Sequence, residues 1–323
     1  MRTGKLTNEQ LDRLILSKLR HTRDEVVCAP SIGVDCTAVK FGEELAVLSC
    51  DPITAAEKGV GRLTVNVSCN DAAAAGAEPI GLMITLLLPP SVNEEDIGAV
   101  MDEIVEAASA AKVDIIGGHT EVTNAVTKIV TCATVIAKPV GASIISPKGM
   151  LPGDDIVVTK HAGLEGALLL AHSAPDGFLT AAEQAEVDTF ADMTNVVREG
   201  IFAAKNGAHA MHDVTEGGIL GALWEMCKAS GCGIEFDRKL IPMRPVTKKL
   251  CRYFDIDPYK LISSGSMLIA VSDGKALVEG LQAIGVDAAV IGRALSLDRE
   301  CEVFDLEGTV IDPPEADEIY KVC

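Results

Sequence analysis

Six acidic residues stand beside glycine or other small residues near the expected ends of helices and strands, where their carboxylates could converge on one site. They are Asp35 in "SIGVDCTAV", Asp51 in "VLSCDP", Asp71 in "VSCNDAAAAGAEP", Glu121 in "DIIGGHTEVT", and Asp213 and Glu216 in "MHDVTEGG". Carboxylates that meet in a low-dielectric site repel one another unless a cation neutralises them. One such acid alone is more often a solvated side chain or a helix cap, so the signal is the set.

Asp71 carries the strongest part of this signal. The segment "LTVNVS" before it and the four alanines after it predict a largely buried helix, in which a carboxylate needs partners. Magnesium, a hard cation with oxygen ligands and a bound polyphosphate, suits such a cluster. The chain has neither a GxxxxGK[ST] sequence nor a GxGxxG sequence at a strand–helix turn, so any nucleotide must bind to other loops.

Three glycine-containing segments could bring backbone close to a ligand. In "DIIGGHTEVT" we expect a strand to end at Gly117 and Gly118, with Thr120 and Glu121 facing a nucleotide; an ordinary polar Gly-Gly turn is the alternative. "TKHAGLEGALLL" and "TEGGILGALWE" each predict a helix N-terminus that could cradle phosphate, at Gly163 and at Gly217-Gly218. For the segment that contains Gly163, a simple strand–helix turn explains the residues equally well.

Two further residues of "MHDVTEGG" are candidate catalytic groups. His212 adjoins Asp213 and could act as an acid–base group if its pKa lies near neutrality. Glu216 follows on the same segment, at the expected helix start.

The composition limits the classes of partner. With 48% hydrophobic and 23% charged residues the chain is an ordinary globular one, and a net charge of −19 argues against nucleic acid and against an anionic membrane surface. The N-terminus reads as an amphipathic helix, and the longest apolar run, 80–90, is too short to span a bilayer. We therefore expect a cytoplasmic protein.

The elements that must position these residues fall into two halves. A chain of 323 residues is long for one core, and "SPKGMLPGDDIVVTK" marks a boundary, so we expect domains at 1–150 and 151–323. Helices are predicted at 58–75 and 93–112 and a long helical stretch at 181–206; strands are predicted at 44–51 and 209–213, among others. Strands and helices interleave without a strict alternation, which favours an α+β fold.

Ten cysteines are scattered without a CxxC pair, so most are expected to be small buried hydrophobic residues and a zinc site is not indicated. Cys323 differs because it is the last residue. A terminal segment can carry a thiol into a cleft, where an exposed thiolate is a competent nucleophile. Chance placement of one cysteine in ten is the alternative.

The motifs together resemble the AIR synthase (PurM-like) superfamily. They are, in order, "GVDCTAV", "SCDP", "GRLTVNVSCNDAAAAGAEPIG", "IIGGHTEV", "LPGDDIVVTK", "MHDVTEGGILGAL" and "ISSGSMLIAV". The resemblance extends over about 32–323 and is greatest to the HypE hydrogenase maturation factors and the AIR-synthase-related proteins. It implies an N-terminal α/β domain that forms a dimeric barrel with a second subunit, a C-terminal α/β sandwich, and ATP with magnesium in the cleft.

The same resemblance implies roles for single residues. Asp35, Asp71 and Asp213 match magnesium-binding aspartates. Asp51 and Glu121 match acids near the phosphates, and Gly117, Gly118 and Thr120 match the backbone that lines the nucleotide. The tail, "YKVC", is similar to HypE tails whose terminal thiol takes a carbamoyl group that ATP helps to dehydrate to a nitrile, with maturation partner proteins; Cys323 would be that thiol.

The resemblance thus implies an ATP- and magnesium-dependent enzyme that activates a carbonyl or carboxamide oxygen by phosphorylation. Two alternatives stay open. One is a small-molecule kinase or ligase similar to thiamine-monophosphate kinase or aminoimidazole ribonucleotide synthase. The other is a catalytically inactive nucleotide-binding scaffold, suggested by Val34, which stands where the family pattern Gly-Asp-Asp-Ala has an aspartate.

Overall fold

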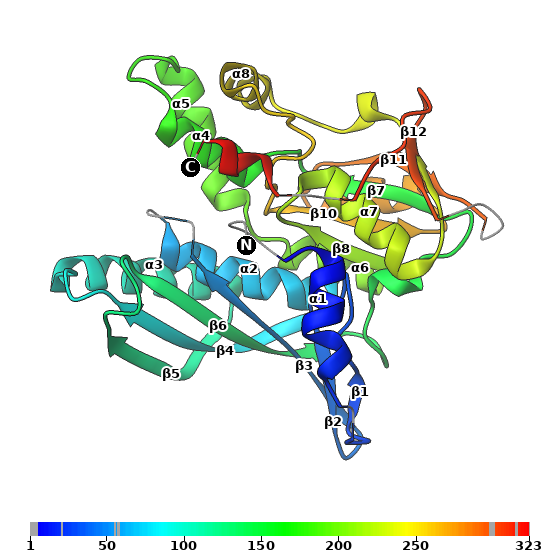
Figure 1. The fold of residues 1–323 in the computed structure, drawn as a ribbon. Coiled ribbons are helices and arrows are strands. Elements are labelled where there is room, and N and C mark those ends of the chain that lie inside the picture. The colour runs from blue at the N-terminus through cyan, green and yellow to red at the C-terminus, as the bar shows by residue number, and fades with distance from the viewer. Residues whose placement is uncertain are drawn as a thin grey trace.

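The computed structural model describes residues 6–20, 22–54, 56, 59–296, 301–313 and 316–322, which form two units of sheet and helix (Figure 1). The first unit has a six-stranded sheet in the order β1-β2-β3-β6-β4-β5, in which only the β4–β5 pair is parallel. Its elements are α1 (Asn8–Leu14), β1 (Val26–Cys28), β2 (Thr37–Phe41), β3 (Glu44–Ile53), α2 (Val60–Ala74), β4 (Ala77–Leu88), α3 (Glu94–Ala111), β5 (Asp114–Val122) and β6 (Val130–Pro139).

Helix α2 is the central element of this unit and confirms the helix predicted around Asp71. Small side chains let it pack closely: a Cβ on Gly61 would lie 2.3 Å from the carbonyl oxygen of Val100 in α3. Gly76, with φ of 67°, ends the helix in the left-handed region that glycine favours. Ala73 and Ala74, at the C-terminal end of α2, pack into the core of the second unit. The helix therefore links the two halves.

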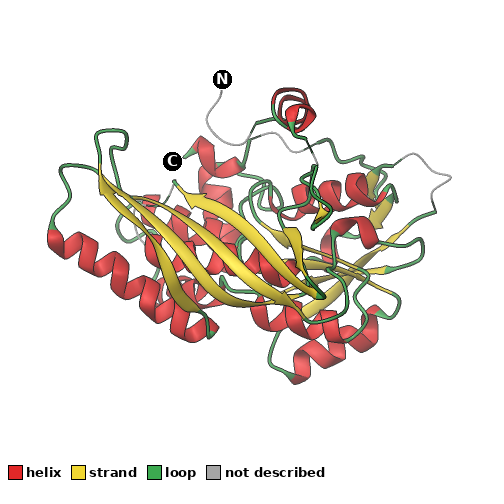
Figure 2. Cartoon of the chain, turned by 90° about the horizontal axis from the view of Figure 1, so that it is seen from below, coloured by secondary structure: helices red, strands yellow, loops and turns green. Residues whose placement is uncertain are grey.

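The opposite face of the first sheet is open. In the described part of the chain α2 and α3 lie on one face only, and Figure 2 shows the strands from the other face with the helices behind them. Apolar side chains of the central and edge strands are exposed there: Ile80 is 53%, Met83 48% and Ile116 52% exposed. An apolar sheet face of this kind is a typical site of association.

The second unit is a sheet with helices on both faces, which matches the C-terminal α/β sandwich that the resemblance implies. Its strand order is β12-β9-β11-β7-β10-β8, and separate apolar cores lie on its two faces. Its elements are β7 (Asp155–Thr159), α4 (Leu164–Ser173), α5 (Ala181–Asp188), α6 (Val197–Lys205), β8 (Ala210–Val214), α7 (Gly218–Ser230), β9 (Ile234–Phe236), α8 (Pro245–Phe254), β10 (Ser266–Val271), α9 (Gly274–Ala283), β11 (Ala288–Ala294) and β12 (Val303–Asp305).

The predicted helical stretch at 181–206 is broken between a short 3-10 segment, Thr189–Met193, and α6. The cause lies in the first unit. The Asn70 amide of α2 donates to the carbonyl of Thr194 and accepts the N–H of Val196, at 2.8 Å each. These bonds satisfy the backbone at the break and fix the second unit against α2. None of the helices in the described ranges has the length and apolarity needed to cross a membrane.

Candidate functional site: a carboxylate cluster between the two units

Asp71 lies at the centre of a cluster formed by α2 and β3. Its Oδ2 is 2.5 Å from Ser49 Oγ, and the same hydroxyl is 3.0 Å from the carbonyl oxygen of Asp35. Burial raises the pKa of Asp71 well above its usual value, and the negative charges of Asp213, Asp51 and Asp35 raise it further. The Ser49 hydroxyl donates to Asp71 Oδ2 and also lies within hydrogen-bond distance of the Asp35 carbonyl, so it links α2 to the loop that carries Asp35.

Asp213 is supplied by the second unit, from the fully buried strand β8. Burial and the charge of Asp35 raise its pKa to about 7, although His212 opposes the shift. One of its carboxylate oxygens, Oδ2, is buried without a hydrogen-bond partner among the described residues. Asp35 comes from the loop before β2, which crosses to the second unit and packs at Gly33 against Glu225 and Ala229 of α7. The side chain of Asp35 is 46% exposed, so the cluster opens to solvent there.

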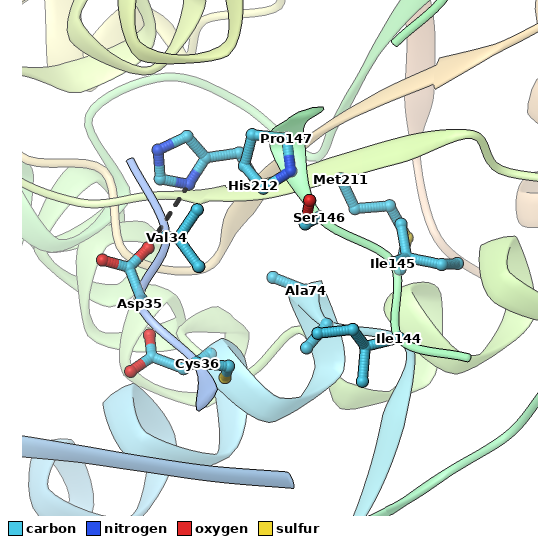
Figure 3. Close-up of a pocket in the computed structure, with 12 residues that line it drawn as sticks. Val34, Asp35, Cys36, Ala74, Ile144, Ile145, Ser146, Pro147, Met211 and His212 are labelled. Carbon is cyan, nitrogen blue, oxygen red and sulfur yellow. Dashed lines mark ion pairs between the residues drawn. The ribbon is translucent and has the colours of Figure 1, made fainter. Parts of the chain in front are cut away.

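His212 lies against the same group of carboxylates. Its Nε2 is 2.9 Å from Glu225 Oε2, and its Nδ1 is 3.9 Å from Asp35 Oδ2 and 4.0 Å from Asp213 Oδ1. Figure 3 shows the imidazole turned toward Asp35 at the edge of a pocket lined by both units. Burial lowers the pKa of His212, but the Glu225 contact and the nearby aspartates outweigh burial and raise it to about 9. His212 is therefore charged at neutral pH in the metal-free protein.

The cluster has the composition of a divalent cation site. Oxygen and nitrogen donors of Asp35, His212 and Asp213 all lie within 4.8 Å of one another. Neighbouring aspartate charges raise the pKa values of Asp71 and Asp213, and one buried oxygen of Asp213 has no hydrogen-bond partner among the described residues; a bound cation would stabilise these groups. The residues present therefore fit the predicted magnesium. The structure brings together Asp35, Asp51, Asp71 and Asp213 from four separate sequence segments, as expected.

The prediction of a turn in "GGHTE" is wrong. Gly117, Gly118, Thr120 and Glu121 all lie inside β5, the exposed edge strand of the first sheet. Three strand spacings, roughly 14 Å, separate β5 from β3, which carries Asp51. Gly118 is required by the sheet itself, since a Cβ there would lie 1.8 Å from the Ile84 carbonyl oxygen of β4. Within one chain, these residues are not part of the cluster. Strand β3 also runs two residues beyond its predicted end at Asp51.

The two predicted phosphate cradles are filled by the chain's own side chains. Gly163 donates its N–H to Ser263 Oγ at 2.6 Å, and Gly217 donates its N–H to Asp317 Oδ2 at 2.6 Å. Both glycines, like Gly218, have positive φ and begin a helix, as predicted. At α7, however, the anion is a carboxylate of the C-terminal segment. A phosphate could bind there only after Asp317 leaves.

Glu216 also contacts this C-terminal segment. The Tyr320 hydroxyl donates to Glu216 Oε1 at 3.1 Å, and Ile319 is buried in the apolar cluster of α4, α5 and α8. The segment Glu318–Lys321 thus lies over the start of α7, on the side of the second unit turned toward α2 and α3 (Figure 1). Cys323 lies outside the described residues, and Val322 is the last residue before it.

Three contributors were missed by the sequence analysis: Ser49, Glu225 and Asp317. Ser49 could have been found, because it shares a strand face with Asp51 two residues later. Glu225 and Asp317 have no local signal. Glu225 contacts His212, 13 positions away, and Asp317 contacts Gly217, 100 positions away.

A pH-dependent stability is expected from Glu165, a buried residue of α4. Burial raises its pKa to about 7, Ser264 opposes the shift, and Asp317 and Glu216 add to it. Because this pKa is raised in the folded state, the stability it contributes is complete below pH 4.5 and is lost as pH rises through 7. Glu165→Gln should therefore gain roughly 3 kcal/mol between pH 4.5 and pH 8 relative to wild type, measured by urea unfolding.

Glu183 is the control with the opposite sign. A hydrogen bond from Lys249 and further bonds from Thr180 lower its pKa to about 2. Its ionised form stabilises the fold above pH 4.5, and this stability is lost as pH falls through 2. Glu183→Gln should be destabilised at pH 7.

The opposite result for Glu165→Gln, a loss of stability at pH 8, would show that the buried Glu165 carboxylate has a stabilising partner.

Comparison with known protein families identifies both units. The model described as "AIR synthase related protein, N-terminal domain" matches residues 33–138, and that described as "AIR synthase related protein, C-terminal domain" matches residues 152–300. Together they match more than half of the chain.

Curated relatives match across most of the chain. A putative hydrogenase expression/formation protein of Methanocaldococcus jannaschii is 28% identical over 330 residues, covering 99% of this chain and 97% of the relative. The carbamoyl dehydratase HypE of Rhodobacter capsulatus is 28% identical over 248 residues, covering 73% and 70%.

Solved structures share the fold at low identity. A ThiL protein complexed with AMPPCP and TMP has a TM-score of 0.77 at 19% identity, covering 98% of this chain and 99% of that one. A hydrogenase maturation protein HypE in complex with ATP has a TM-score of 0.70 at 20% identity, covering 98% and 94%. A HypE–HypF complex has a TM-score of 0.73 at 22% identity, covering 86% and 93%.

Proposed function

The chain belongs to the AIR synthase related protein family, and on this basis we propose that it is an ATP-dependent carbamoyl dehydratase of the HypE type. The relatives named as carbamoyl dehydratases support the reaction, and the ATP complex of a HypE supports the co-substrate. The single observation that carries the proposal is the cluster of Asp35, Asp71 and Asp213 between the two units. Several aspartates converging in this way suit a cation that carries a polyphosphate.

The expected cation is magnesium, and Asp35, Asp71 and Asp213 would hold it, with Asp51 beside them. When bound, it would neutralise the phosphate charges and orient the γ-phosphate. In the metal-free protein the protonated His212 supplies a positive charge at the same place. These side chains bind and orient the nucleotide, and the cluster's position between the units lets residues of the second unit reach the transferred group.

The reaction balances without any further reagent. The oxygen of an S-carbamoyl group on Cys323 attacks the γ-phosphorus, and ADP leaves. The carbon–oxygen bond then breaks with loss of phosphate while the nitrogen gives up its protons, which leaves a thiocyanate, S–C≡N. Glu216, held beside the tail by Tyr320, is the proposed base for the nitrogen proton.

We further propose a homodimer through the open face and β5 edge of the first sheet. Ile80, Met83 and Ile116 are exposed there, and an unpaired edge strand is a ready template for pairing. In the dimer, β5 of the second copy would bring Gly117, Gly118, Thr120 and Glu121 to the nucleotide. A maturation partner that supplies the carbamoyl group is suggested by the HypE–HypF complex.

The test is a mass measurement on the full chain. Cyanate carbamoylates thiols, and adding ATP and magnesium to the carbamoylated protein should remove one water mass from a C-terminal peptide and release ADP. A kinase of the ThiL type would instead phosphorylate an added small molecule. A scaffold would bind ATP and release no ADP. Either of these outcomes would replace the proposed function.

Asp317→Ala should release the C-terminal segment 316–322, here called the tail, without changing nucleotide binding. It leaves the N–H groups of Gly217 and Ile319 without their acceptor, so the tail is expected to undock. Hydrogen exchange at 316–322 should rise at least about tenfold, which corresponds to about 1.4 kcal/mol, while ATP affinity stays unchanged. Asp312→Ala, an exposed change in the preceding segment, is the control. Unchanged exchange in Asp317→Ala would mean that the apolar contacts of Ile319 hold the tail alone.

A further inference from the structure

The geometry of His212 differs from that of a histidine that only balances charge. Glu225 accepts from Nε2 at 2.9 Å and thereby fixes the ring. Nδ1 is turned toward Asp35, as Figure 3 shows, and lies on the side of Asp213 as well. Nδ1 is 3.9 Å from one carboxylate oxygen and 4.0 Å from the other, both beyond hydrogen-bond distance. A carboxylate that orients the far nitrogen of a histidine is the usual outer partner of a metal-bound imidazole.

The remaining donors also point to a ligand. Asp213 is only 2% exposed, and its Oδ2 has no hydrogen-bond partner in the described ranges, although it is buried. An unpaired buried carboxylate oxygen is costly unless a cation or donor meets it. Donors bound side by side to one ion at about 2.1 Å lie about 3 Å apart, so the two distances from Nδ1 need to shorten by roughly 1 Å and the distance between the two carboxylates by up to about 2 Å. Asp35 stands on a half-exposed loop that can supply this movement.

Resting on the proposed function, which places a divalent cation in this cluster, we propose that His212 is itself a metal ligand. The structure assigns Asp35, His212 and Asp213 to one subsite for a first-row transition-metal ion, with Mn²⁺ as the ion of choice. Imidazole nitrogen favours such ions over magnesium, whereas carboxylate and phosphate oxygens suit Mn²⁺ as well. Asp71 and Asp51 are not part of this three-donor group. Asp71 would hold the magnesium that arrives with ATP, with Asp51 beside it, and Asp35 and Asp213 would serve both ions.

Glu225 is the positioning residue of this subsite. It does not face the ion itself, since its Oε2 contacts Nε2 on the far side of the ring. Its removal should weaken metal binding through the orientation of His212. This gives a second variant in which the ligand set itself is unchanged.

The experiment uses the full-length protein without nucleotide and with Mn²⁺ as the probe. Free Mn²⁺ is counted by electron paramagnetic resonance, and nitrogen coupling to the bound ion is read by pulsed measurement on the same samples. We expect Mn²⁺ to bind on the order of tenfold or more tightly than Mg²⁺, with a nitrogen coupling. His212→Gln should lose the coupling and weaken Mn²⁺ binding by about ten- to a hundredfold, with Mg²⁺ affinity changed less than about threefold.

Glu225→Ala should weaken Mn²⁺ binding by about tenfold and keep some nitrogen coupling, and thermal unfolding of both variants reports whether they fold. Equal affinity for the two ions, absence of nitrogen coupling in wild type, or unchanged Mn²⁺ binding in folded His212→Gln would each overturn the assignment. Failure here is distinguishable from failure of the proposed function. His212→Gln tests the subsite in the absence of ATP, while the dehydration assay tests the reaction with magnesium present.

Discussion

Asp71→Asn is expected to weaken magnesium-dependent ATP binding by about two orders of magnitude and, at the same time, to stabilise the metal-free protein. The two effects have one origin. Burial and the charges of Asp213, Asp51 and Asp35 raise the pKa of Asp71 well above its usual value, so its ionised form opposes folding. Only a bound cation turns that charge into a favourable one. Asn keeps the shape and can still accept the Ser49 hydroxyl at the position of Oδ2.

The sign of the pH dependence follows from the raised pKa. A carboxylate whose pKa is higher in the folded state than in the unfolded state contributes stability at low pH that is lost as pH rises through the folded value. Wild-type protein in a chelator should therefore lose stability with rising pH, and Asp71→Asn should lose less. At pH 8 we expect the variant to be more stable by about 1–2 kcal/mol.

Titration calorimetry and thermal unfolding test the two effects separately. Removal of one charged ligand should weaken Mg·ATP binding by about two orders of magnitude. Unfolding in a chelator gives the stability change, and unfolding with magnesium and ATP should reverse the order of the two proteins. Asp102→Asn, on the exposed side of α3, changes the net charge alone and should do neither. ATP binding of wild-type strength in Asp71→Asn would mean that the aspartates are structural.

Local sequence patterns predicted those parts of the fold that depend on local physics. Helix α2 was expected at 58–75 and is found at Val60–Ala74, because alanine-rich composition, Gly76 and Pro79 define it within a few residues. The demand that a buried carboxylate be partnered correctly placed Asp71 in a cluster. Asp35 and Asp213 could be grouped with it by their positions near element ends, but the same pattern also included Glu121, so only the family resemblance separated the magnesium-binding aspartates from the other acids.

The wrong predictions concern residues whose role depends on a contact with a distant part of the chain. Gly118 was interpreted as a turn residue, but its missing side chain makes room for the carbonyl of Ile84 in the neighbouring strand. Gly217 was interpreted as a phosphate cradle, and its N–H is bound by Asp317, 100 residues later. A glycine in the sequence indicates that another group comes close to the backbone, but it does not indicate whether that group is a ligand or another part of the protein. Both glycines meet parts of their own chain.

That result bears on how the tail could work. The start of α7 attracts an anion, and in this structure Asp317 supplies it. The docked tail places Tyr320 on Glu216, which follows Asp213 by three residues, so the last described residues contact the segment that carries one aspartate of the cluster. Hydrogen bonds from one carboxylate and one hydroxyl allow the tail to undock and dock again. The proposed function requires such movement, because the Cys323 thiol must reach both a carbamoyl donor and the ATP site.

Cys323→Ser is expected to eliminate the ATP-dependent loss of water completely while leaving ATP affinity unchanged. The thiol is the only group of the tail that can carry an S-carbamoyl group, whereas the docking contacts of Asp317 and Tyr320 do not involve it. The matched control is Cys50→Ser, which removes an exposed thiol of β3 that cyanate can also reach.

After treatment with cyanate and then with ATP and magnesium, mass analysis of C-terminal peptides should show dehydration in wild type and in Cys50→Ser. Dehydration that persists in Cys323→Ser would place the carbamoyl group elsewhere on the chain. No dehydration in any protein, with ADP still released, would show that the enzyme phosphorylates a different oxygen.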